Sequence, residues 1–219
     1  MQKLECTAIL FDLDGVLVDS TAAVGRAWSR WALKHGLEPK TVVHAAHGRR
    51  TVETMRALAP HLDSDGEARE MENEEARDMT GVTVVPGADL LLRSLPDGQW
   101  GIVTSGTRTM ATARLRDTGH VIPKVLVTAD DVVDGKPHPE PYLKGAKGLG
   151  IAPELCVVFE DAPAGIRAAH AAGMRVIALT TTFPPEELRE AEAVVTNFHD
   201  VRVGRNAEGK LEISLQNDR

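Results

Sequence analysis

Two aspartates spaced two residues apart, Asp12 and Asp14, follow an apolar, β-prone stretch that starts at Thr7, and Gly15 comes next. Residues i and i+2 of a strand point to the same side, so both carboxylates can converge at the C-terminal end of this strand, while glycine lets the chain turn away. Ligands bind at that end of an open α/β sheet, and crowded carboxylates there raise one pKa or attract a cation. An ordinary acidic turn is the alternative, because Asp-Gly is a common turn pair. The strand before the pair and the turn after it favour a functional site.

Three later segments place polar residues at the ends of further β-prone stretches. Thr104 and Ser105 end one of them with hydroxyls and amides that can bind phosphate oxygens, and a Ser/Thr helix cap is the alternative. Lys136 lies in a proline-bounded turn that few surface lysines have, and a simple loop is its alternative. Glu160 and Asp161 end another strand with paired acids where a hard cation could sit, and helix capping is the competing role of Asp161. The order of these motifs at successive strand ends is more specific than any one of them.

The elements that must position these residues alternate between strands and helices after residue 85. Short runs rich in Val and Ile are typical of strands buried on both faces, and four of them cover residues 100–104, 124–128, 155–159 and 174–179. Helical stretches lie between them at 107–118, 139–148 and 163–172. This alternation predicts the α/β class, with a doubly wound parallel sheet of the Rossmann-like type.

Residues 20–82 interrupt this alternation with helical spacing of apolar residues and with charged helical stretches. We expect them to form a helical cap inserted after the first strand, with residues 1–19 and 83–219 forming the catalytic core. The acidic run 63–78 is expected to be the solvated face of the cap and not a metal site, because charge runs usually are. Residues 82–87 are expected to be the return linker, and 201–203 and 211–215 to be the strands of a small C-terminal hairpin.

Composition narrows the function classes. The chain has 219 residues with 42% hydrophobic content, enough for a proper core, and a net charge of -7, which disfavours nucleic acid as a partner. No apolar run approaches a membrane span and the N-terminus enters strand material directly, so we expect a cytoplasmic protein with no signal peptide. Cys6 and Cys156 are expected to be buried, reduced thiols. No protein partner is evident.

The four motifs together resemble those of the haloacid dehalogenase-like hydrolase superfamily, in its phosphatase branch with a helical cap after the first strand. The resemblance extends over nearly the whole chain except the final hairpin. Segments 47–51, 104–108, 135–144 and 159–166 are similar to a group of yeast glycerol phosphatases and 2-deoxyglucose-6-phosphatases, and 26–37 to bacterial sugar phosphatases. The resemblance implies a phosphatase that acts on small sugar or polyol phosphates.

The resemblance also implies roles for the core motifs. Asp12 would attack phosphorus and form an aspartyl-phosphate, which divides hydrolysis into two displacements. Asp14 would protonate the leaving alcohol and then activate water, a role that favours an acid with a raised pKa. Lys136 would orient Asp12 and neutralise developing charge.

The implied binding groups include a metal and both sides of the substrate. Mg²⁺ would be held by Asp12, the backbone carbonyl of Asp14 and Asp161, with Glu160 nearby. Thr104 and the Ser105 amide would hold phosphoryl oxygens. On the cap, Arg50, or else Arg49, would contact the substrate, with a plain surface charge as the alternative for either arginine.

Rival functions differ from a phosphatase at identifiable positions. A dehalogenase needs no acid two residues after the nucleophile and no magnesium, so Asp14 argues against it. Sugar phosphomutases of the β-phosphoglucomutase type share the four motifs, but carry a histidine twelve residues after the nucleophile where this chain has Val24. A phospho-acceptor signalling domain shares aspartates, a Thr/Ser and a lysine, but its usual size leaves no room for residues 20–82. The physiological substrate and the oligomeric state stay open.

Overall fold

A six-stranded parallel sheet forms the centre of the computed structural model, which describes residues 2–216. Its strands lie in the order β6 (Leu126–Val127), β5 (Trp100–Val103), β2 (Ala8–Phe11), β7 (Cys156–Glu160), β8 (Arg175–Leu179) and β9 (Ala193–Val195). The first core strand of the chain therefore lies in the middle of the sheet, between β5 and β7. This order is that of a doubly wound α/β fold and confirms the predicted class.

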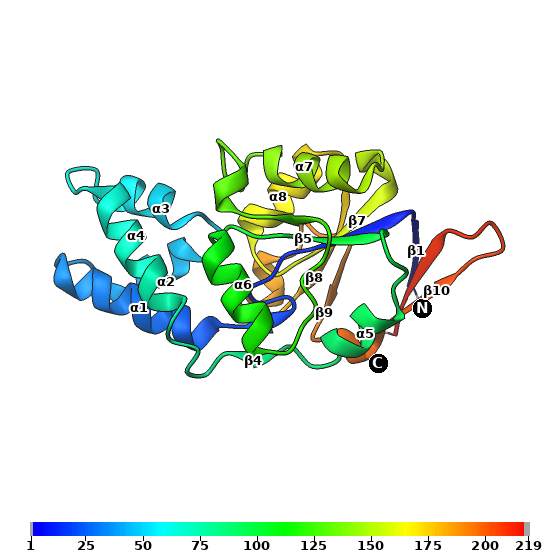
Figure 1. The fold of residues 1–219 in the computed structure, drawn as a ribbon, viewed down its shortest axis with the longest axis horizontal. Helices are drawn as coiled ribbons and strands as arrows, with labels where there is room; N and C mark the ends of the chain where they lie inside the picture. The colour runs from blue at the N-terminus through cyan, green and yellow to red at the C-terminus, as the bar shows by residue number, and fades with distance from the viewer. Residues whose placement is uncertain (1, 217–219) are drawn as a thin grey trace.

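Helices cover both faces of the sheet, as its apolar strands require. Along β2, Ile9 and Phe11 belong to one buried cluster, whereas Ala8 and Leu10 belong to another, because successive side chains point to opposite faces. The first cluster includes α5 (Ala88–Ser94) and α6 (Arg108–Asp117), and the second α7 (Glu140–Leu149) and α8 (Pro163–Ala171). Figure 1 shows α7 and α8 along one side of the sheet and α5 and α6 on the other.

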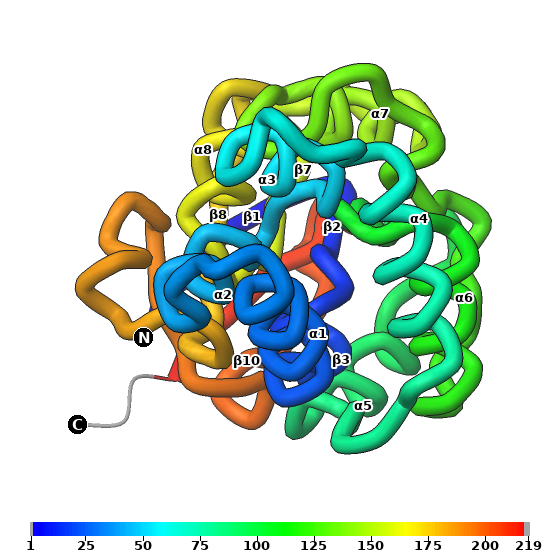
Figure 2. The backbone as a smooth tube through the Cα atoms, turned by 90° about the vertical axis from the view of Figure 1, so that its left-hand side faces the viewer, coloured from blue at the N-terminus to red at the C-terminus, as the bar shows by residue number. Residues whose placement is uncertain are grey.

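Four helices form the predicted cap at one end of the molecule (Figure 1). They are α1 (Thr21–Lys34), α2 (Pro39–Ala46), α3 (Thr51–Leu58) and α4 (Ser64–Glu75). They enclose a core of their own that includes Trp28, Trp31 and Met55. Two short antiparallel strands, β3 (Val18–Asp19) and β4 (Thr83–Val84), join this cap to the sheet. The tube view along the cap shows α1 to α4 in front of the sheet and its strand ends (Figure 2).

The chain ends in the predicted hairpin, which gains a third strand. β10 (Val201–Arg205) and β11 (Leu211–Leu215) pair antiparallel, and β1 (Gln2–Cys6) pairs with the other edge of β11. Short 3-10 turns cover Ala129–Asp131, Pro153–Leu155, Pro185–Glu187 and Phe198–Asp200. Cys6 and Cys156 are both buried and free, as predicted, and burial raises the pKa of Cys6 to about 12 and of Cys156 to about 11.

The structure departs from the sequence-based prediction in several places. The expected strand 124–128 shortens to β6 at the edge of the sheet, and the expected linker 82–87 contributes β4. The strand material at the N-terminus forms a separate strand, β1, in another sheet, and β9 was not anticipated. The acidic run 63–78 is not uniformly solvated, since Glu75 in the last turn of α4 is buried. Charge alone gave no sign of this, because a buried arginine of the core provides its counter-charge. No helix in residues 2–216 is long and apolar enough to cross a membrane.

Candidate active site

The C-terminal edge of the parallel sheet brings the predicted core motifs together. Asp12 directly follows β2, Thr104 follows β5, and Glu160 and Asp161 come at the end of β7. Because β2 lies between β5 and β7, these strand ends are neighbours although the residues are far apart in the sequence. Lys136 reaches the same place from the loop before α7, where its ammonium group contacts Asp12.

Lys136 is fully enclosed by the groups it contacts. Its Nζ donates to Asp12 Oδ1 at 2.7 Å, to Glu160 Oε1 at 2.7 Å and to the carbonyl of Val103 at 3.1 Å. Burial lowers the pKa of Lys136, but the two carboxylates outweigh burial and raise it well above the ordinary value. The lysine is therefore a fixed positive charge beside Asp12.

Glu160 positions Lys136 and is itself held by three other hydrogen-bond donors. Its Oε1 also accepts from the Tyr142 hydroxyl at 2.9 Å, and its Oε2 accepts from the backbone N–H groups of residues 161 and 162 at 2.8 and 3.0 Å. Gly165 makes room for this carboxylate, because a Cβ at that position would come within 1.6 Å of Oε1. With four donors already in place, Glu160 is better suited to positioning the lysine than to binding a metal directly.

Asp12 and Asp161 make the acidic cluster that suits a divalent cation. Oxygens of Asp12, Glu160 and Asp161 all lie within 4.8 Å of one another, and all three residues are buried. Burial and the neighbouring carboxylates raise the pKa of Asp12 to about 7 and that of Asp161 well above its ordinary value. One lysine does not offset this crowding, so hard oxygen ligands with excess negative charge fit a cation such as Mg²⁺. Gly15, at φ +80°, is needed here because a Cβ would lie 1.8 Å from Asp161 Oδ2.

The Asp14 carboxylate is held by two residues that the sequence analysis missed, Ser20 and Arg114. Its Oδ1 accepts from Ser20 Oγ at 2.7 Å and lies 2.5 Å from Arg114 Nη1. Asp14 Oδ2 lies on the side of Gly106, where an added Cβ would be 4.0 Å away. Both contacts converge on one oxygen, so the other faces the segment expected to bind phosphate.

Arg114 is a fully buried arginine that also reaches the cap. Its Nη2 donates to Glu75 Oε1 at 3.2 Å, and its side chain is 2% exposed. A signal for it existed in the sequence, because Arg114 lies at helical spacing between the apolar residues Met110 and Leu115 on the buried face of α6. Burial raises the pKa of Glu75 to about 7, against the lowering effect of Arg114.

Thr104 and Ser105 are not used to cap the following helix. The N-cap residue of α6 is Thr107, whose side chain accepts a hydrogen bond from Met110 N. Thr104 Oγ1 accepts from Gly106 N at 3.1 Å, and Ser105 Oγ donates to the carbonyl of the cap residue Gly48 at 3.1 Å. The Ser/Thr helix cap that was the alternative for this motif is therefore present, at Thr107 and not at Thr104 or Ser105. Asp161 makes no capping bond to α8, so the capping alternative for Asp161 is wrong.

A pocket lies between these core residues and the cap. Its core side is lined by Asp12, Asp14, Gly15, Ser20, Thr104, Ser105, Gly106, Met110, Arg114, Asp161 and Thr182, and its cap side by Thr21, Val24, Trp28, Ala46, His47, Gly48, Arg49, Thr51 and Glu75. Arg49 is thus at the pocket. Arg50 is not among its lining residues, and its Nη1 donates instead to the carbonyl of Val133 at 2.8 Å and to Glu53 at 3.1 Å.

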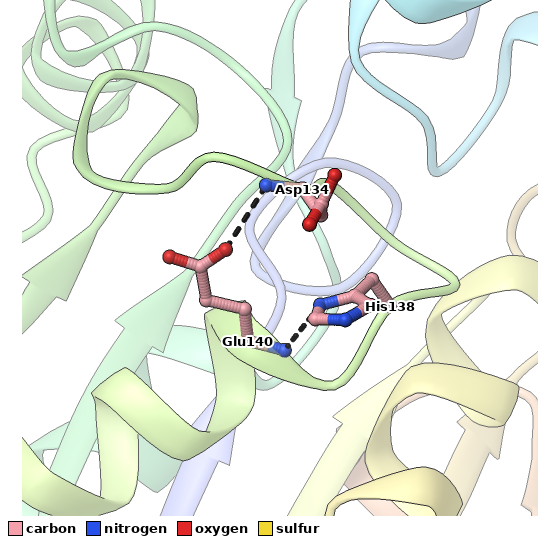
Figure 3. Close-up of side chains that lie close together, drawn as sticks. All are labelled: Asp134, His138 and Glu140. Carbon is pink, nitrogen blue, oxygen red and sulfur yellow. Dashed lines mark hydrogen bonds between the residues drawn. The ribbon is translucent and has the colours of Figure 1, made fainter.

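A second group of metal-type side chains lies on the outer side of the Lys136 loop. Asp134, His138 and Glu140 have potential ligand atoms within 4.8 Å of one another (Figure 3). Glu140 accepts from Asp134 N at 3.0 Å and pairs with Lys144 at 2.7 Å. The backbone hydrogen bond from Asp134 and the contact with Lys144 lower the pKa of Glu140 to about 2. These bonds shape the loop that presents Lys136.

Comparison with known proteins agrees with this geometry. A profile described as "Hydrolase: haloacid dehalogenase-like hydrolase" matches residues 6–173. The chain is 42% identical over 215 residues to hexitol phosphatase A from Escherichia coli, covering 96% of this chain and all of the relative. It is 39% identical over 216 residues to glycerol-1-phosphate phosphohydrolase 2 from Saccharomyces cerevisiae, covering 92% of this chain and 86% of the relative.

A solved structure with a similar fold is β-phosphoglucomutase from Clostridium difficile. It superposes with a TM-score of 0.76 at 27% identity, covering 88% of this chain and 91% of that one. The similarity extends over most of both chains, so the two proteins share a fold.

Proposed function

This chain belongs to the haloacid dehalogenase-like hydrolase family, and from that premise we propose that it is a phosphatase for the monoesters of small polyols and sugars. The observation that supports this most directly is the buried contact between Asp12 and Lys136. It lies at the C-terminal ends of the strands, next to the pocket between the core and the cap. Relatives named for hexitol and glycerol phosphates support the substrate class.

Asp12 is the proposed nucleophile. Its Oδ1 is held by Lys136 at 2.7 Å, which leaves Oδ2 to form the bond to phosphorus. The alcohol departs as the new bond forms, and the product is an aspartyl-phosphate on the chain itself. Lys136 stays beside the reacting oxygens and balances the charge that they gain, while Thr104 and the Ser105 amide hold the phosphoryl oxygens.

Asp14 is the proposed proton donor and acceptor. Because Arg114 and Ser20 both contact Oδ1, Oδ2 on the side of Gly106 is the oxygen available to protonate the leaving alcohol. The same oxygen then takes a proton from water, which attacks the aspartyl-phosphate and releases inorganic phosphate.

The metal in this proposal is Mg²⁺, held by Asp12, Asp161 and the backbone carbonyl of Asp14. The buried acidic cluster supports this assignment, because among residues 2–216 Lys136 is the one cationic side chain that pairs with Asp12. When bound, the ion offsets the repulsion between the carboxylate nucleophile and a phosphate dianion. Glu160 stays with Lys136 and acts on the site through it.

Phosphate release from a panel of monoesters tests the proposal. The wild-type protein with Mg²⁺ should release phosphate fastest from hexitol, glycerol or hexose phosphates and more slowly from nucleoside monophosphates. Asp12→Asn, which removes the nucleophile and keeps the volume, should release none above background while retaining the wild-type circular dichroism spectrum. Preference for nucleotides, or release by the folded Asn variant, would contradict the assignment.

A phosphomutase is the second candidate, because β-phosphoglucomutase has a similar structure. Val24 argues against a phosphomutase. It lines the pocket with an apolar side chain, whereas mutases of that type carry a histidine at this position. A mutase must protect its phospho-enzyme from water until the sugar phosphate returns. With a hexose 6-phosphate, ³¹P NMR should therefore detect inorganic phosphate without the 1-phosphate isomer, and faster isomer formation would favour the mutase.

A further inference from the structure

One carboxylate of the cap, that of Glu75, lines the pocket but has no role in the proposed chemistry. Glu75 is 6% exposed and ends α4, whereas its neighbour Glu74 has a side chain that is 58% exposed and pairs with Arg30 at 3.5 Å. Burying a carboxylate is unfavourable unless a partner is present, and Arg114 supplies only one bond, to Oε1. In residues 2–216 no hydrogen bond to Glu75 Oε2 is found, and that oxygen is not among the polar atoms that are both shielded from solvent and without a partner.

Arg114 ties this cap carboxylate to the reaction centre. Nη2 contacts Glu75 Oε1, while Nη1 contacts Asp14 Oδ1, so a single rigid guanidinium separates the two acids. The bridging oxygen of the leaving alcohol must lie close to Asp14 in order to receive its proton. The remainder of that alcohol has to occupy the pocket between core and cap, whose cap side includes Glu75.

Two other cap residues that line the pocket suit an alcohol with several hydroxyl groups. Trp28 offers an apolar ring surface to C–H groups, and Thr51 offers a hydroxyl, and both line the same pocket. A carboxylate accepts hydrogen bonds from hydroxyl groups and donates none, so it distinguishes a polyol from an alkyl chain. An alkyl leaving group would leave Oε2 without a partner after water is excluded.

We propose that Glu75, held in place by Arg114, determines specificity by accepting hydrogen bonds from the hydroxyl groups of the leaving alcohol. The inference rests on the proposed phosphatase function and adds a named recognition residue to it. It assigns to the last turn of α4 a part of substrate selection that the sequence analysis gave to Arg49 and Arg50.

The test compares two substrates that need the same proton from Asp14. Sorbitol 6-phosphate carries hydroxyl groups along its chain, and butyl phosphate carries none. The measured quantity is the ratio of kcat/KM for sorbitol 6-phosphate to kcat/KM for butyl phosphate. Glu75→Met keeps the length of the side chain and removes the acceptor, so this ratio should fall about 10- to 100-fold, the value of a hydrogen bond to a charged group. Glu75→Gln keeps one acceptor oxygen and should give a smaller fall.

Glu74→Met is the matched control, because it makes the same change one residue earlier on the solvated side of α4 and should leave the ratio within about twofold of wild type. An unchanged ratio in the Glu75 variants would overturn the inference. If kcat/KM falls equally for both substrates, the role of Glu75 is structural. If Glu75→Met does not fold, an unchanged ratio in Glu75→Gln overturns it. If the wild type hydrolysed neither of the two compounds, the proposed function would be overturned, and this inference with it.

Discussion

Replacing Lys136 by methionine should destabilise the chain and abolish turnover through the same contacts. The ammonium group lies 2.7 Å from both Asp12 and Glu160 and is the charge that lets two buried carboxylates approach each other. Methionine matches most of the volume of lysine, although it loses the cation–π contact in which Nζ lies 4.9 Å from the centroid of the Tyr142 ring. The substitution therefore removes a charge and leaves packing nearly intact.

The magnitude follows from what the substitution leaves behind. Breaking a buried ion pair by removing one partner costs about 3–5 kcal/mol, because the remaining charge stays buried. Here two carboxylates remain, and protonation of one of them limits the cost to the same range. We expect the free energy of unfolding to fall by about 3–5 kcal/mol in EDTA, and by less with Mg²⁺, which supplies positive charge to Asp12.

Urea unfolding followed by circular dichroism measures this difference, with and without Mg²⁺. Lys147→Met is the control, because Lys147 is an exposed lysine on α7, and it should change the free energy of unfolding by less than about 0.5 kcal/mol. A Lys136→Met variant within about 1 kcal/mol of wild type in EDTA would refute the argument that Lys136 compensates a buried acidic cluster.

Three further predictions concern the proton donor, the cap and the acidic residues. Asp14→Asn should lower single-turnover phosphorylation about 100-fold or more with an alkyl phosphate but much less with p-nitrophenyl phosphate, which needs no proton, and equal losses would contradict the donor role. Arg49→Ala, at the pocket, should raise the KM for sorbitol 6-phosphate about tenfold, and a larger effect from Arg50→Ala would reverse that assignment. Burial raises the pKa of Asp12 and Glu75 to about 7 each, so the folded chain retains protons that the unfolded chain loses above about pH 4. Thermal melts in EDTA should therefore show stability falling as the pH rises from about 4 to 7, with Mg²⁺ stabilising more at about pH 8 than at about pH 5, and a flat profile would contradict those shifts.

The core of the fold was predictable because local patterns and topology agree in it. Asp12, Thr104 and Glu160 each follow an apolar run, and parallel strands bring such positions to one edge whatever the length of the segments between them. The sequence signal for the two-residue strand β6 and for the additional strand β9 is weaker, because edge strands are short and carry little apolar signal. Gln2–Cys6 pairs with a hairpin more than 200 residues away, a contact that no local pattern predicts.

Side-chain partners across the cap and the core were the part that the sequence could not supply. Arg49 and Arg50 are adjacent, and only the geometry of the loop before α3 sends one to the pocket and the other to the carbonyl of Val133. Glu75 lies in a run of acids that differ only in which side of α4 they occupy. The helical spacing places Arg114 on a buried face, but its two partners come from separate segments 39 and 100 residues earlier.

Identification of the phosphorylated residue tests the central claim most directly. Asp14→Asn protein, in which attack of water is slowed, is mixed with p-nitrophenyl phosphate and Mg²⁺, quenched, and treated with borohydride, which reduces an aspartyl-phosphate to homoserine. Mass spectrometry should find homoserine at position 12 only when substrate is present, and in no sample that also carries Asp12→Asn. Modification at another aspartate, or none in a sample that has released one equivalent of p-nitrophenol, would contradict the account.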